Sequence, residues 1–161
     1  MNIDKLILCA TKDKVSAAKE AYRAIKAELL LNSSSKNPKP EGKIIQKLFF
    51  HRPGEEDFEI EINELDLSII KKQIEIREEQ INMYDANSRK DLADMYREQN
   101  LVLKALLPPE ISKDKIQEAV ITAYPNGYTQ KEMGKVIKEI KAIYPTADGK
   151  LISEVVKEHI I

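Results

Sequence analysis

Three short amphipathic stripes fill the last third of the sequence, and each begins at a residue that can cap a helix. Ser112 precedes the first stripe, Thr129 the second and Asp148 the third. Thr129 is followed three residues later by Glu132, which is the spacing of a capping box. Isolated helices shorter than ~12–15 residues are marginal in water, so these stripes must pack on one another. The pattern predicts a small C-terminal three-helix domain over 111–161.

Two longer stripes in the middle of the chain predict a pair of long helices. Asn63 can cap the first helix, whose first turn is acidic, as the positive end of a helix dipole favours. The stretch DANSRKD, 85–91, predicts a short reversal, and Pro108-Pro109 ends the second helix. Because so short a turn joins them, we expect the two helices to pack antiparallel.

The sequence of the first third of the chain predicts a helical segment followed by a loop. Residues 3–31 carry apolar or small side chains at helical spacing, and Thr11 is placed to cap a helix that continues to Leu31. The stretch NSSSKNPKPEG, 32–42, is rich in residues that favour loops. We therefore predict an N-terminal helical domain over 1–107 with a variable insertion at 32–62.

The insertion contains two short apolar segments that are compatible with a β-hairpin. KIIQKLFF is an apolar run, HRPG is a turn, and DFEIEIN alternates apolar and acidic residues as strands do. This pattern predicts a small hairpin that pairs 44–50 with 57–62. An ordered loop laid over the helices is the alternative. The predicted fold class is therefore mainly all-α, with a β-hairpin insertion at 44–62.

Composition excludes several classes of function. Charged residues make up 33% of the chain but balance to a net charge of −1, so no strong field attracts nucleic acid or anionic membranes. Trp is absent and only 6% of residues are aromatic, which argues against a platform on which bases stack. The lone Cys9, the lack of a secretory signal and the lack of a long apolar segment predict a cytoplasmic protein without a membrane partner.

The residue types that usually carry chemistry are not arranged for it. His51 and His159 lie far apart and neither has a second ligand at metal spacing, so no metal site is predicted. Cys9 has no partner in a recognisable motif and is expected to be a core residue. The acids Glu75, Glu78 and Glu79 fit the exposed face of a long helix. We predict no catalytic residue and no cofactor.

Two glycine-containing segments in the C-terminal domain allow two interpretations. Gly134, in EMGKVIKEI, should cost ~0.5–1 kcal/mol in a helix interior, so its presence has a reason. That reason is either close packing of another helix or close approach of a partner, an RNA phosphate beside Lys135 included. In ADGK, Asp148 caps a helix whose start could attract an anion, with Lys150 in the first turn.

These segments, with the long helices before them, resemble a known family. The stretches SRKDLADMYREQNLVLKALLPPEIS, KEMGKVIKEI and ADGKLISEVVKEHI, in this order, are similar to the YqeY family. The similarity covers roughly 63–161 well and the first thirty residues weakly. The C-terminal part also resembles the tail domain of GatB, the tRNA-recognising subunit of the glutamine-dependent tRNA amidotransferase. In this sequence Pro145-Thr146 stand where the family usually has Gly-Arg.

The resemblance implies a helical N-terminal domain, a three-helix tail and a role in holding tRNA. It suggests a non-catalytic accessory protein that binds tRNA weakly. A protein–protein adaptor is one alternative, and a carbon–nitrogen ligase with glutamine as amido donor, as the family is commonly classed, is another. The residues carried over as RNA-binding candidates are Lys131, Gly134, Lys135, Lys138, Asp148, Gly149 and Lys150.

Overall fold

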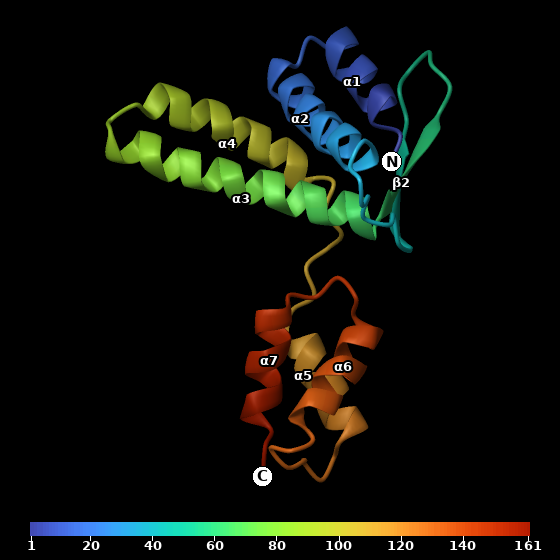
Figure 1. The fold of residues 1–161 in the computed structure, drawn as a ribbon, viewed down its shortest axis with the longest axis vertical. Helices are drawn as coiled ribbons and strands as arrows, with labels where there is room; N and C mark the ends of the chain where they lie inside the picture. Colours follow the sequence, from blue (N-terminus) through green and yellow to red (C-terminus); the bar gives the residue numbers. More distant parts are fainter. The chain divides into compact units, whose positions relative to one another are not determined.

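The computed structural model describes all 161 residues, which form two compact units, Met1–Leu107 and Pro108–Ile161. Seven helices and one two-stranded antiparallel sheet make up the chain (Figure 1). The predicted fold class, mainly helical with a small β-hairpin, is confirmed.

The N-terminal unit contains four helices and the hairpin around one apolar core. In chain order its elements are α1 (Ile3–Lys12), α2 (Ser16–Ser33), β1 (Ile44–Phe50), β2 (Phe58–Asn63), α3 (Glu64–Ala86) and α4 (Lys90–Lys104). The core gathers fully buried aliphatic side chains from each layer, among them Leu6 of α1, Ile25 of α2, Ile60 of β2, Ile70 of α3 and Leu103 of α4.

The hairpin packs one face of its two strands on the core. Ile60 and Ile62 are fully buried, and the rings of Phe50 and Phe58 stack with centroids 5.0 Å apart. On the opposite face Lys47 contacts the carboxylates of Glu59 and Glu61 across the strands. The predicted hairpin is confirmed, and the alternative of an ordered loop laid over the helices is wrong.

The first helical segment differs from the prediction, because two helices stand where one capped helix was expected. Thr11 lies inside α1, and its hydroxyl donates to the Ile7 carbonyl at 2.8 Å instead of capping. The chain turns at Lys14, whose φ of 56° is left-handed, and α2 then starts without a side-chain cap. The polar residues at 11–14, Thr-Lys-Asp-Lys, interrupt the apolar stripe at this turn, and the predicted continuation of one helix overlooked the interruption because no glycine or proline marks it.

The long pair α3 and α4 begins at a reciprocal cap, as predicted for Asn63. The Asp66 amide donates to Asn63 Oδ1 at 2.8 Å, and the Asn63 amide donates to Asp66 Oδ2 at 3.1 Å. The two helices then run side by side and antiparallel, joined by the short reversal at 87–89 (Figure 1).

The C-terminal unit is a three-helix bundle with an apolar core. Its helices are α5 (Lys113–Ala123), α6 (Met133–Ile143) and α7 (Gly149–Glu158). Ser112 caps α5 and Asp148 caps α7, both as predicted. The fully buried core residues all lie on these three helices: Ile116, Val120, Val136, Ile140, Ile152, Val155 and Val156.

Thr129 does not cap α6, contrary to the prediction. The Thr129 hydroxyl donates to the Glu132 carboxylate at 2.9 Å, so its oxygen is turned away from the helix amides. The Glu132 amide instead donates to the Thr129 carbonyl at 2.9 Å, which closes a turn, and the helix begins only at Met133. Half of the capping box remains, because the Thr129 amide donates to the Glu132 carboxylate at 3.0 Å.

Candidate functional site

The outward face of α6 carries a row of lysines. Lys135, Lys138 and Lys141 are all exposed and follow one another at three-residue spacing. At 3.6 residues per turn this spacing keeps them within roughly one third of the helix circumference. The opposite face carries the buried Val136 and Ile140. We call Lys135, Lys138 and Lys141, with Lys131 in the turn before the helix, the α6 lysine face.

Gly134 lies at the start of this face and is not packed against anything. It is the second residue of α6, and a Cβ built on it would meet no atom within 4 Å. Close approach of another helix, the simpler interpretation of this glycine, is therefore wrong. The backbone of Gly134 is therefore open beside Lys135. An incoming group can approach this backbone more closely than it could approach the backbone of a residue with a side chain.

The second candidate segment lies at the other end of the helix pair. The Ile161 amide donates to the Tyr128 carbonyl at 3.1 Å, and the Tyr128 hydroxyl donates to the Val156 carbonyl. The chain entering α6 therefore lies against the end of α7, and the two helices are antiparallel (Figure 1). The start of α7, with Gly149 and Lys150, is separated from the start of α6 by about the length of one helix, ~15 Å at 1.5 Å per residue.

The start of α7 is also less cationic than its sequence suggests. Asp148 is exposed, and its Oδ1 accepts from the Lys150 amide at 2.9 Å. The carboxylate therefore already occupies the helix terminus that an anion would use. Gly149 has nothing within 4 Å of a built Cβ, as at Gly134. The seven predicted residues thus form two separate groups instead of one cluster.

Lys141 belongs to the α6 lysine face but was not among the predicted residues. The signal that identifies it is the regular three-residue spacing of 135, 138 and 141. Glu139, on the same helix, accepts a hydrogen bond of 2.5 Å from the Tyr124 hydroxyl and lies 3.9 Å from Lys135. The hydrogen bond that the Tyr124 hydroxyl donates to Glu139 raises the pKa of Tyr124 to about 12, because ionising the phenol would remove the donated proton.

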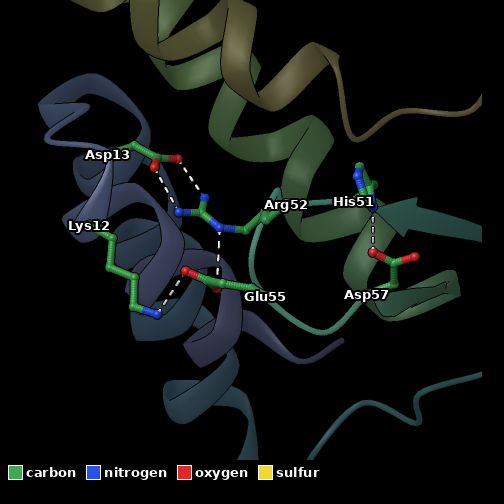
Figure 2. Close-up of polar contacts among 6 residues, drawn as sticks. All are labelled: Lys12, Asp13, His51, Arg52, Glu55 and Asp57. Atoms are coloured by element: carbon green, nitrogen blue, oxygen red, sulfur yellow. Dashed lines mark hydrogen bonds and ion pairs between the residues drawn. The ribbon is translucent and has the colours of Figure 1, made fainter.

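A second polar cluster fastens the turn of the hairpin to α1, and Figure 2 shows its members. Arg52 donates two hydrogen bonds to Asp13, at 2.6 and 2.7 Å, and its Nε lies 3.3 Å from Glu55. Lys12 donates to the other oxygen of Glu55 at 3.1 Å. Nearby in sequence, His51 Nδ1 lies 2.6 Å from Asp57, and both side chains are largely exposed.

The charges of this cluster are already paired. The Arg52 hydrogen bond holds the pKa of Asp13 below its usual value, and the Lys12 hydrogen bond does the same for Glu55.

A pocket of about 260 Å³ adjoins the cluster and is lined by Cys9, Tyr22 and Arg52 among apolar side chains. Burial raises the pKa of Tyr22. Carboxylates held ionised by cations are poor general bases, so we assign the cluster a structural role.

The chain holds no group of three or more His, Cys, Asp or Glu side chains placed to bind a metal ion. None of its helices combines the length and the apolar character that crossing a membrane requires.

Comparison with known proteins identifies one family. The model described as Yqey-like protein matches residues 44–160. The match begins at the first residue of β1, so it includes the hairpin, which the sequence alone assigned to a variable insertion at 32–62. The first thirty residues, where a weak similarity was expected, lie outside it. No curated protein matches the chain.

Proposed function

The chain belongs to the Yqey-like protein family, and from this premise we propose that its C-terminal unit is a weak, non-catalytic RNA-binding module, with tRNA as ligand. The observation that carries the proposal is the α6 lysine face. Four lysines lie on or beside one exposed helix surface, and an unpacked glycine leaves the backbone open among them. Phosphate groups are the ligands that such a row of exposed ammonium groups suits best.

The expected affinity is modest. Residues 111–161 hold eight Lys and seven Asp or Glu, so 8 − 7 leaves a net charge of only +1. Attraction therefore comes from the local face and not from the unit as a whole. No aromatic side chain lies within the face to stack on a base. We expect binding without sequence readout, nearer to the non-specific range of ~10⁻⁴–10⁻⁶ M than to a specific complex.

A salt titration with matched lysine variants tests the proposal. Lys138→Ala combined with Lys141→Ala should weaken binding of the full chain to bulk tRNA, and should lower the salt slope by about 0.7–0.9 for each phosphate that is no longer neutralised. The control combines Lys115→Ala with Lys157→Ala, two exposed lysines without an ion pair on α5 and α7. Both pairs remove the same charge.

Equal losses in the two double variants would mean that only net charge matters. No binding at low salt would remove RNA as the ligand and leave a protein partner as the better candidate.

Lys135→Ala should weaken tRNA binding, as the variants of Lys138 and Lys141 should. Lys150→Ala should cost less, because Asp148 holds a negative charge beside it.

The two open glycines give a second, sterically matched test. An added Cβ meets nothing at either Gly134 or Gly149, so both Ala variants should keep or slightly raise stability, by up to about 1 kcal/mol. Only Gly134→Ala should weaken tRNA binding, because only Gly134 lies within the lysine face. Equal binding by both variants would contradict close approach of the RNA backbone at Gly134.

A further inference from the structure

The core of the N-terminal unit contains an arginine without a counter-ion. Arg77, in the middle of α3, is only 6% exposed. Its guanidinium donates to Gln99 Oε1 at 2.9 Å, to Gln73 Oε1 at 2.8 Å and to the Gln73 carbonyl at 3.1 Å. All three acceptors are neutral, and no carboxylate pairs with the charge.

A charge buried in this way is costly, because neutral dipoles replace its hydration only in part. Burial lowers the pKa of Arg77. The one neighbouring group that can carry a negative charge and so oppose this shift is the Tyr96 phenol. The other buried polar side chains around it, Gln73, Gln99 and Asn100, are all neutral. Arg52 is the contrasting case, since the same unit provides Asp13 and Glu55 for it.

One edge of the Arg77 guanidinium is free. Nη2 makes no hydrogen bond within the chain, yet it is not among the side-chain atoms that are sealed from solvent without a partner. Arg77 lines an open pocket of about 520 Å³ between α2 and α4, together with Tyr96 and Gln99 on one side and Glu20 and Arg23 on the other. The unbonded edge is therefore the part of the side chain that a solute can reach.

We propose that this pocket binds the carboxylate group of a small organic acid, with Arg77 as its counter-ion. The two hydrogens of Nη2 and the Tyr96 hydroxyl are donors suited to carboxylate oxygens. A single negative charge fits better than a phosphate dianion, because Glu20 stands at the rim and already engages Arg23 at 3.3 Å. The proposal concerns a different unit from the RNA-binding face and does not depend on it.

The test is an NMR titration of the full chain with sodium acetate at pH 7, against sodium chloride at equal ionic strength. Acetate should produce saturable shifts at the Arg77 Nε–H and at the side-chain amides of Gln73 and Gln99, and chloride should not. Arg77→Gln should weaken acetate binding by about tenfold or more, as expected for loss of a charged hydrogen bond. Arg97→Gln is the control, because Arg97 is an exposed α4 arginine already paired with Asp85 and Asp94.

Absence of a saturable acetate response would overturn the proposal, as would an unchanged response in Arg77→Gln. Tighter binding of inorganic phosphate than of acetate would overturn the assigned ligand class.

A surface variant keeps the test valid even where Arg77→Gln fails to fold. Glu20 is 57% exposed, so Glu20→Gln leaves the core untouched. It removes the negative charge at the rim and should tighten acetate binding about twofold to threefold, the scale of one partly screened charge. Unchanged or weaker acetate binding in Glu20→Gln would place the anion elsewhere and overturn the proposal.

Discussion

The two units bury different kinds of side chain. All five buried polar or charged residues of the chain lie in the N-terminal unit: Asp66, Gln73, Arg77, Gln99 and Asn100. The core of the C-terminal unit is aliphatic apart from Tyr128, whose hydroxyl is satisfied by the Val156 carbonyl. One unit is thus held together by an apolar core with a polar layer between α3 and α4, and the other by an apolar core alone.

Because of this difference, we expect the C-terminal unit to bind a ligand on its surface and the N-terminal unit to bind one in a pocket. An apolar core determines only how the three C-terminal helices pack, so the charges of that unit are all on its surface, where the α6 lysine face lies. In the N-terminal unit the polar layer brings a guanidinium inside the fold, and an internal charge can recognise a ligand in a pocket. The predictions that follow are ordered by the size of the expected effect.

The largest effect on the free energy of unfolding is expected from truncating a buried side chain in the core of one unit while the core of the other unit is unchanged. Ile140 and Ile70 are both fully buried helical isoleucines, one in each unit. Ile→Ala at either position should cost ~2–5 kcal/mol, from lost burial and the cavity left behind. In hydrogen exchange on the full chain, Ile140→Ala should reduce protection only within 108–161, and Ile70→Ala only within 1–107.

Loss of protection in both units from either substitution would mean that they unfold as one. Limited proteolysis gives an independent check, because we propose that 1–107 and 111–161 are separate domains. Cleavage near Pro108-Pro109 should release a folded fragment of about 111–161. A fragment without helical circular dichroism would contradict independent folding.

A smaller effect is expected at the helix starts of the C-terminal unit. The Asp148 carboxylate accepts from an amide of α7, so Asp148→Ala should destabilise that unit by ~0.5–2 kcal/mol. Thr129→Ala should cost less, because its hydroxyl bonds the Glu132 carboxylate and caps no helix amide. Denaturant unfolding of the two variants measures the difference. Equal losses would show that Thr129 caps α6 in solution after all.

The same contrast explains what could be predicted from the sequence. Caps such as Asn63 and Asp148 are local signals, and the apolar stripes they precede determine the helices and the C-terminal core. The turn at Lys14 gives only a weak local signal, because the polar stretch 11–14 interrupts the apolar stripe but contains no glycine or proline. Contacts such as that of Arg52 with Asp13, 39 residues apart, depend on how the chain folds back.

The candidate site divides in the same way. The α6 lysines share one helix, so their common face follows from their spacing in the sequence. Lys150 was expected to join them, but the antiparallel arrangement of α6 and α7 places it at the opposite end. Arg77 reads in the sequence as one more charge on a long helix, and only tertiary packing reveals that it is buried without a carboxylate.

The smallest effect on global stability is expected from acid, and it should be confined to the hairpin of the N-terminal unit. The pKa values of Asp13 and Glu55 lie below their ordinary 3.8 and 4.5, because Arg52 and Lys12 favour the ionised forms. The attachment of the hairpin turn is therefore complete above about pH 5 and is lost as the pH falls through the lowered values. Protection factors at 51–57, each taken against the intrinsic exchange rate at the same pH, should fall there while the core of 108–161 stays protected. Arg52→Gln should show the lower protection factors already at pH 7, with little further change in acid; a hairpin that stays protected in this variant would mean that apolar packing alone holds it.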